Sequence, residues 1–357
     1  MITIQKRDSV TRKQGALRQL ASIAGALMIG ALVIFLSGYN PGTVYIEIIR
    51  GSLGSGYSIS ETVQTVIPLL IMALGVTICF KVKFINIGPE GQFYTGAMAA
   101  TYFAITWPDL PRGALLALMC ASSIAMGGLW CVIPALLKVK VGVNETLVTL
   151  MMNYIAIKFV AYLQYGPWKD PSVIGYPVIR QFSQSGILPD ALGVHSGWII
   201  AILLLIGMIA LLGKTKYGYK ITVLGENPNT ARYAGYGTAK LLVSATFIGG
   251  GLCGIAGFIQ ASGVENSLNA MLSNGWGFTS IVVAWMGRLK PLPIVAVSVL
   301  IAVLIQGCTY LQISMGVPYF MASVIQAIIL FFILGSDFFM NYRIVRRQGD
   351  KEAEARR

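Results

Sequence analysis

The residues of this chain that could do chemistry are few, and each stands alone in apolar surroundings. Two carboxylates are the clearest cases: Glu90 in "INIGPEGQF" and Glu145 in "GVNETL". An acid inside or near the hydrocarbon of a membrane is energetically expensive and marks a pathway for a solute or a coupling ion. An acid in the first turn of a helix instead complements the positive end of the helix dipole. Both interpretations are open for these two residues.

Patterns for catalysis and metal binding are not found in the sequence. His195 is the only histidine, and there is no HExxH, GxSxG or Asp-rich cluster. The five cysteines lie in apolar stretches without CxxC or Cys/His ligand spacing, which predicts small core residues. Gly213-Lys214-Thr215 lacks a glycine at the distance that a Walker A motif requires. We therefore expect a chain that is not an enzyme and holds no metal, so that any ATP must be bound by a partner.

A glycine-rich stretch, "FIGGGLCGIAGFIQASG", formally contains the dinucleotide pattern Gly249-x-Gly251-x-x-Gly254. That pattern needs a preceding strand, which is not predicted here. The spacing of Gly250 and Gly254 instead indicates close packing of helices. The polar residues that follow could meet a solute or form a solvated loop, and both interpretations are open for Gln260, Glu265, Asn266 and Asn269.

The composition places the elements that carry these residues in a membrane. Of 357 residues, 55% are hydrophobic and 11% are charged, less than half the charged share of a soluble domain. A helix needs about 20 mostly apolar residues to cross the hydrocarbon. Long runs without charge predict about ten crossings and an all-α polytopic fold; they are residues 20–39, 62–80, 91–108, 113–137, 146–165, 196–213, 241–263, 278–287 and, broken at 312–318, two within 291–336.

The charge distribution predicts the orientation. With both termini in the cytoplasm, all but five of the 27 Lys and Arg residues fall on inner segments, as the positive-inside rule requires. The net charge of +13 therefore needs no nucleic-acid partner. We expect a basic cytoplasmic arm at residues 1–19, a transmembrane domain at 20–336 and a cytoplasmic tail at 337–357.

Polar residues cluster at the inner ends of the third and fifth predicted spans. Gly88-Pro89-Glu90 suits the start of a helix, and Asn144 suits an N-cap. Alternatively, residues 88–92 form an interrupted helix that lines a central pathway, a feature of transporters. The residues that we expect to face such a pathway are Asn86, Glu90, Gln92, Asn144, Glu145 and Asn153.

An inner loop at residues 214–240 carries local helix signals of its own. Asn227 can cap a helix, Pro228 suits the first helical position, and Gly235 suits a left-handed stop. The result is a helix of about two turns, too short to be stable alone in water. Either a partner provides a docking surface for this helix, or the loop packs on its own transmembrane domain.

Four segments resemble a known family: "FINIGPEGQFYTGAMAA", "VKVGVNETLVTLMMNYIA", "LGENPNTARYAGY" and "GFTSIVVAWMGRLKPLP". They are similar to the inner-membrane permeases of bacterial ABC importers for nucleosides and simple sugars, in the superfamily of ribose and branched-chain amino acid permeases. The resemblance covers roughly residues 60–336 and is greatest to the nucleoside branch. Pro89, where this branch has a small residue, is a minor departure.

This resemblance implies a permease subunit in the bacterial plasma membrane, with a small-molecule substrate and membrane lipid around it. It also implies a second homologous permease, a cytoplasmic ABC ATPase that holds ATP and Mg²⁺, and an extracytoplasmic solute-binding lipoprotein. No cofactor is expected in this chain. The role of the ATPase-coupling helix falls on Gly225, Glu226, Asn227, Ala231, Arg232 and Gly235.

Three other classes of protein compete with the permease. In an ion-coupled secondary transporter of a small polar solute, Glu90 or Glu145 would carry the coupling proton or ion. An intramembrane enzyme for lipids needs clustered acids or a metal set, whereas this sequence scatters its acids. A structural membrane subunit without a transport path does not explain the helix-breaking residues. The ATP-driven permease is the function that the sequence favours.

Overall fold

The computed structural model describes residues 2–6, 25, 27–318, 320–328, 331 and 342–346. The predicted arm and tail lie outside the described residues, apart from two strands, β1 (Ile2–Lys6) and β4 (Tyr342–Arg346). These strands pair antiparallel, with Ile2 opposite Arg346. The chain forms two compact units, Gly56–Ala302 and the segments on either side of it.

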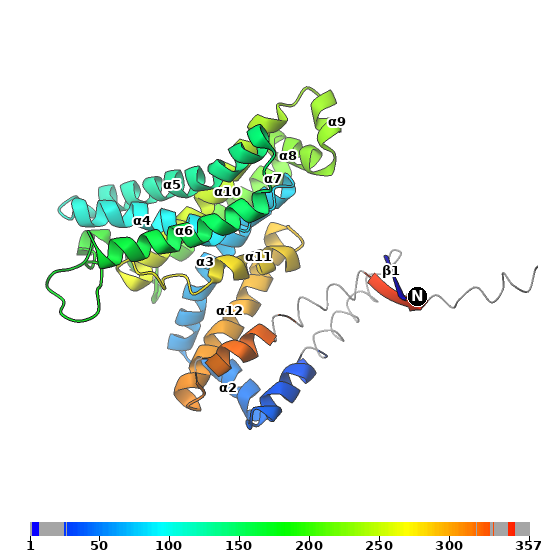
Figure 1. Ribbon diagram of the computed structural model, residues 1–357. Helices are drawn as coiled ribbons and strands as arrows, with labels where there is room; N and C mark the ends of the chain where they lie inside the picture. The colour runs from blue at the N-terminus through cyan, green and yellow to red at the C-terminus, as the bar shows by residue number, and fades with distance from the viewer. Residues whose placement is uncertain are drawn as a thin grey trace, which may run out of the picture. The chain divides into compact units, whose positions relative to one another are not determined.

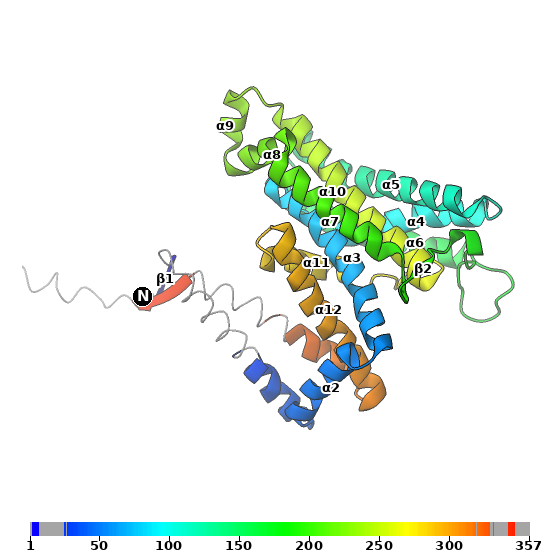
Figure 2. The ribbon, with the colours of Figure 1, turned by 180° about the vertical axis from the view of Figure 1, so that it is seen from behind.

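The larger unit, Gly56–Ala302, is a bundle of α-helices (Figures 1 and 2). In chain order it contains α3 (Gly56–Lys81), α4 (Pro89–Thr106), α5 (Arg112–Val141), α6 (Glu145–Tyr165), α7 (Gly197–Lys214), α8 (Lys216–Glu226), α9 (Pro228–Tyr233), α10 (Thr238–Gln260), α11 (Trp276–Met286) and the first part of α12 (Pro291–Ser314). A 3₁₀ turn, Gln184–Gly186, a π turn, Ala261–Glu265, and the two-residue strands β2 (Asp190–Ala191) and β3 (Val194–His195) complete it.

The expected all-α membrane fold is confirmed, but the count of ten spans is not. Six of the described helices are long and apolar enough to cross a membrane: α3, α5, α6, α7, α10 with its π turn, and α12. A seventh crossing is counted if Leu27–Leu36 and α2 (Pro41–Leu53), which meet at 114°, form one span. Helix α4 has 18 residues and α11 has 11, and neither is among the six. The number ten therefore remains a prediction.

Glycines allow α10 to lie against three other helices at backbone distance. A Cβ atom on Gly254 would be 2.1 Å from the carbonyl oxygen of Ser123 in α5, and one on Gly257 would be 2.1 Å from that of Phe93 in α4. A Cβ on Gly249 would be 2.7 Å from the carbonyl oxygen of Gly75 in α3. The predicted close packing through small residues is confirmed, and it makes α10 the centre of the larger unit.

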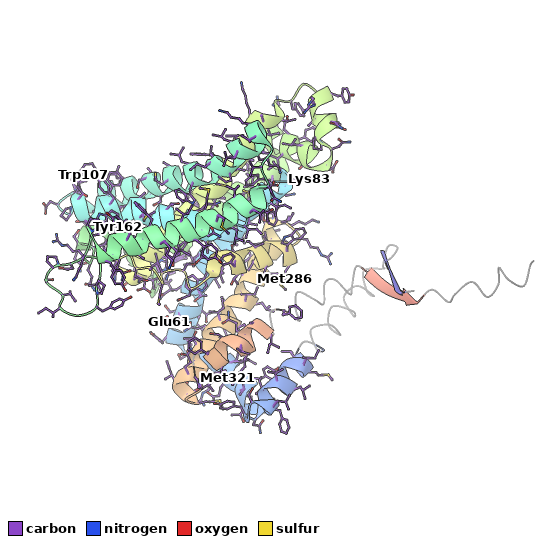
Figure 3. All side chains as sticks on the ribbon, viewed as in Figure 1. Glu61, Lys83, Trp107, Tyr162, Met286 and Met321 are labelled. Carbon is purple, nitrogen blue, oxygen red and sulfur yellow. The ribbon has the colours of Figure 1, made fainter. Side chains whose placement is uncertain are left out.

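The two ends of this bundle differ. Helices α8 and α9 lie at one end, and the loop that follows α6 lies at the other (Figures 1 and 2). Lys83 is at the first end, whereas Trp107 and Tyr162 are at the second (Figure 3). Basic residues at or near the ends of the other helices lie at the same end of the bundle as α8 and α9: Lys81, Lys138, Lys140, Lys214, Lys240, Arg288 and Lys290. The positive-inside rule predicts that this end faces the cytoplasm.

The smaller unit contains a helix that the apolar runs do not predict. Asn40 caps α2 by accepting hydrogen bonds from the N–H groups of Gly42 and Thr43 at 2.9 and 3.4 Å. Within this unit, α2 packs on the end of α12 through Gly51, which lies against the side chain of Tyr310. The predicted break after α12 is confirmed, since α12 ends at Ser314 and residues 320–328 form another helix.

The packing of α10 gives a prediction about stability. We expect Gly254→Ala to lower the free energy of unfolding by about 1–3 kcal/mol, because the added methyl group meets a backbone carbonyl that cannot give way. Gly207→Ala in α7 is the matched control, since nothing lies within 4 Å of its Cβ position. Thermal unfolding of the detergent-solubilised protein measures both variants. Equal stability of the two variants would contradict the backbone contact.

Candidate functional site

A non-helical segment, residues 82–88, joins α3 to α4 and carries the first of the expected pathway residues. Asn86 is fully buried, and its side-chain amide pairs reciprocally with that of Gln92 in α4. The Asn86 Nδ2 group donates to Gln92 Oε1 at 3.2 Å, and Gln92 Nε2 donates to Asn86 Oδ1 at 3.0 Å. The same Oδ1 atom accepts from the N–H group of Gly88 at 2.9 Å. The pair therefore shapes the turn into α4.

Two residues of α6 satisfy the backbone of this segment. Asn153 Nδ2 donates to the carbonyl oxygen of Ile87 at 2.7 Å, while its Oδ1 accepts from the N–H group of Gly91 at 2.8 Å. The hydroxyl of Thr149 accepts from the N–H group of Ile87 at 3.1 Å. These backbone groups have no partner in a helix, and a buried group left unpaired would be strongly destabilising. Asn153 therefore acts as an external cap for α4.

Glu90 lies where the first turn of α4 meets the first turn of α11. Only 3% of its surface is exposed, and its Oε2 accepts from the N–H group of Gly277 at 2.7 Å. The beginning of a helix presents unpaired N–H groups and a positive dipole end, which an acidic side chain complements. Glu90 therefore supports the start of α11 from inside the bundle, and its role toward a solute stays a prediction.

Tyr94 joins α4 to the non-helical segment that precedes α11. Its hydroxyl donates to the carbonyl oxygen of Ala270 at 2.9 Å and accepts from the N–H group of Ser273 at 3.2 Å. Glu90 and Tyr94 stand one helical turn apart on the same face of α4. Together they hold residues 270–277 against α4, a connection that sequence reasoning missed because the partners are more than 170 residues away.

Glu145 and Asn144, at the start of α6, also bind within the chain. Asn144 Oδ1 accepts from the N–H groups of Thr146 and Leu147, so the predicted N-cap is confirmed. Glu145 forms an ion pair with Lys138 and accepts from the N–H group of Ile85 at 3.4 Å.

Five of the six expected pathway residues thus hold the residue 82–92 region or α11 in place, and Asn144 caps α6. Their role toward a solute remains a prediction.

The predicted short helix in the inner loop is confirmed as α9. Asn227 Oδ1 accepts from the N–H groups of Asn229 and Thr230 at 2.9 and 3.4 Å, Pro228 begins the helix, and Gly235 follows it with a φ of +75°. The preceding residues form α8, which we did not predict. Its signal was present, because Thr215 Oγ1 accepts from the N–H group of Gly218 as an N-cap.

The residues expected to couple to an ATPase lie at the end of α8, along α9 and just after it. Ala231 is the buried member of α9, whereas Tyr233 is 92% exposed. Gly225 lies so close to α3 that a Cβ atom would overlap the carbonyl oxygen of Lys81. The remaining members are exposed: Glu226, Asn227, Arg232 and Gly235.

A cavity of about 1030 Å³ opens at the end of the bundle away from α9. Glu265 and Asn269, named from the sequence, line it together with Gln164, Tyr176 and Arg180, which sequence reasoning missed. Gln164 is buried in α6, accepts from the N–H group of Ala270 at 3.1 Å and donates to the carbonyl oxygen of Pro177 at 2.9 Å. An amide inside an apolar helix was the signal that could have identified it.

His195 lies in the segment that joins α6 to α7. It is buried beside the start of α7, and its Nδ1 accepts from the N–H group of Gly197 at 3.2 Å. Burial lowers the pKa of His195 below its usual value, which favours the neutral ring that can accept this bond. Among the residues that the structure describes, His, Cys, Asp and Glu side chains do not gather in groups of three that could hold a metal.

Comparison with known proteins decides the family. The pattern of the branched-chain amino acid transport system / permease component matches residues 58–334. The chain belongs to this family of permeases.

Three relatives cover nearly the whole permease. A guanosine ABC transporter permease protein of Bacillus subtilis is 30% identical over 92% of this chain and 95% of its own length. A nucleoside ABC transporter permease protein of Lactococcus lactis is 29% identical over 98% of both chains. A glucose ABC transporter permease protein of Haloferax volcanii is 29% identical over 94% of this chain and 92% of its own. No solved structure matches the chain significantly.

These findings make the protein a transport component that crosses the plasma membrane several times. The predicted family, the membrane location and the class of transport protein are confirmed. The structure adds a polar junction of α4, α6 and α11, where amides and one carboxylate replace missing helix hydrogen bonds.

This junction gives a second prediction. We expect Asn153→Leu to lower the free energy of unfolding by about 2–4 kcal/mol, because it leaves the Ile87 carbonyl and the Gly91 N–H group buried without partners. Tyr154→Phe, an exposed neighbour on α6, should change stability by less than about 0.5 kcal/mol. Denaturation of both variants in detergent compares them. A stable Asn153→Leu protein would show that water or lipid can replace the cap.

Proposed function

We propose that this chain is the permease subunit of an ATP-driven importer that carries nucleosides across the plasma membrane. The observation that supports this most directly is its similarity, over more than nine-tenths of its length, to permease proteins named for nucleosides and guanosine. Membership of the permease family and the apolar helices fit the same function.

A simple sugar is the second candidate substrate. The relative named for glucose is as similar to this chain as the nucleoside permease is, at 29% identity. A nucleoside contains a ribose, so the two substrates share hydroxyl groups that amides and carbonyl oxygens can bind. Only the nucleoside adds a flat base that can stack on aromatic side chains.

The energy source in this proposal is a cytoplasmic ABC ATPase, which binds ATP and Mg²⁺ and docks on α9. With only six residues, this helix gains little stability by itself. Of its side chains Ala231 is the buried one, while Arg232 and Tyr233 are exposed. Exposed arginine and tyrosine are typical anchors of protein interfaces. A docked ATPase would cover them.

The proposed transport cycle uses alternating access. Closure of the ATPase on ATP displaces α9, the helices tilt, and a solute delivered by an extracytoplasmic binding protein passes between this permease and a second one. Since the binding protein selects the solute, the pathway needs only weak hydrogen bonds. Asn86, Glu90, Gln92, Asn144, Glu145 and Asn153 are the proposed sources of those bonds when the helices move.

The bonding of the two acids argues against an ion-coupled transporter. Glu145 is paired with Lys138, and Glu90 accepts from the α11 backbone. Both acids support helix starts, which accounts for their positions without a coupling ion.

Reconstitution tests the proposed function. Vesicles that contain this permease, its neighbour permease and the ATPase, supplied with binding protein outside and ATP inside, should accumulate labelled guanosine. The permease alone should accumulate none under a proton or sodium gradient. Accumulation by the isolated permease on an ion gradient would refute the proposal. Accumulation of labelled glucose but not of labelled guanosine by the complete complex would make a sugar the substrate.

A single charge reversal tests the docking of α9. We expect Arg232→Glu to lower guanosine uptake by about tenfold or more, because losing about 1.4 kcal/mol of docking energy has that effect. Lys140→Glu, an exposed residue at the end of α5, is the charge-matched control and should transport normally. Both proteins should reach the membrane in equal amounts, as judged by immunoblotting. Normal uptake by Arg232→Glu would remove α9 from the interface.

A further inference from the structure

Lys83 occupies a backbone position that usually belongs to glycine. It follows the end of α3 with a φ of +54°, in the left-handed region. Its N–H group donates to the carbonyl oxygen of Phe80 at 3.0 Å, and the N–H group of Phe84 donates to that of Cys79 at 3.1 Å. This pattern is a Schellman motif, in which the left-handed residue is most often glycine. A lysine in this place is strained, and such strain persists only where the surrounding structure holds the residue.

The side chain of Lys83 reaches the corner between α8 and α9. Its Nζ donates to the carbonyl oxygen of Glu226, the last residue of α8, at 3.1 Å. Next to Glu226, Gly225 lies directly against the carbonyl oxygen of Lys81. The last turn of α8 is thus seated on the end of α3, and α9 begins two residues later at Pro228.

The backbone of Lys83 is also held by a lysine near the end of α5. The Nζ group of Lys138 donates to the carbonyl oxygen of Lys83 at 3.1 Å and pairs with Glu145, which accepts from the N–H group of Ile85. Lys138 lies over the ring of Phe84 as well, 5.6 Å from its centre. Residues 83–85 therefore contact α8 as well as the ends of α5 and α6.

We infer that Lys83 is a positioning residue for transport: it transmits displacement of α9 to the start of α4. Residues 83–85 lead directly to Asn86 and, through Gly88, to Glu90, which holds α11. Movement of the α8–α9 corner is passed on through the Lys83 ammonium group and the Gly225 contact. The inference rests on the proposed function, because it assumes that an ATPase moves α9.

The end of α11 supplies a matched control. Arg288 is also a basic residue in the left-handed conformation, with a φ of +52°, and its N–H group donates to the carbonyl oxygen of Trp285 in the same motif. Among the hydrogen bonds and ion pairs of the residues that the structure describes, none involves the Arg288 side chain. Replacement of either residue by glycine relieves the same backbone strain, but only Lys83→Gly removes a link to α8.

The experiment compares Lys83→Gly, Lys83→Arg and Arg288→Gly in the reconstituted importer with guanosine as solute. Lys83→Gly should keep its ATP hydrolysis rate and thermal stability, but move roughly three- to tenfold less guanosine per ATP, since one exposed charged hydrogen bond is lost. Arg288→Gly and Lys83→Arg should keep the wild-type ratio. If Lys83→Gly does not accumulate, Lys83→Asn replaces it, because asparagine also tolerates the left-handed region.

The outcomes separate this inference from the proposed function. An unchanged guanosine-to-ATP ratio in Lys83→Gly, with wild-type transport intact, overturns the role of Lys83 and leaves the importer proposal standing. An equal fall in the guanosine-to-ATP ratio in Lys83→Gly and Arg288→Gly also overturns it. The added flexibility of glycine at such a turn, and not the lost link to α8, would then explain the fall. Failure of the wild-type complex to transport guanosine with ATP contradicts the proposed function instead.

Discussion

The structure depends on one constraint: backbone N–H and carbonyl groups that leave a helix inside an apolar bundle must find partners in the same chain. Two segments of the larger unit leave helical structure within the bundle, residues 82–88 and 266–275. Side chains satisfy both of them. Asn153 and Thr149 bind the first segment, and Tyr94 and Glu90 bind the second and the start of α11.

This constraint explains why three buried amide side chains of so apolar a chain meet at the start of α4. Asn86, Gln92 and Asn153 are amides, which can donate and accept at once and so can satisfy both kinds of backbone group. Glu90 is ionisable, and its carboxyl group accepts from the N–H group of Gly277 in the first turn of α11. The cluster therefore has a structural purpose before any solute is present. A pathway that uses the same residues would have to exchange these bonds for bonds to the solute as the helices move.

The elements that could be predicted from the sequence are those with local causes. Asn227, Pro228 and Gly235 lie within nine residues and determine α9 through capping chemistry alone. The small residues of α10 likewise predict close packing, although not which helices they meet. By contrast, α2 was missed even though Asn40 and Pro41 repeat the Asn-Pro signal of α9, because Glu47 and Arg50 interrupt the apolar run.

The contacts that could not be predicted join distant parts of the chain. Glu90 meets Gly277, 187 positions later, and Lys83 meets Glu226, 143 positions later. Such pairs depend on how whole helices pack, which hydrophobic patterns do not specify when a helix is apolar on all sides. The sequence identified Glu90, Glu145 and Asn153 as unusual residues. It did not distinguish a solute pathway from a set of buried caps, and only the bonding partners make the second role visible.

The central claim is that α9 and residues 83–85 move as one body. Spin labels at Tyr233 and Ile85, which are both exposed, measure this directly in the assembled importer with and without ATP. The account predicts that the distance between these two labels stays constant, while distances from Tyr233 to the far end of the bundle, at Tyr162, change. A change in the Tyr233–Ile85 distance on addition of ATP would show that α9 moves independently, and would contradict the account.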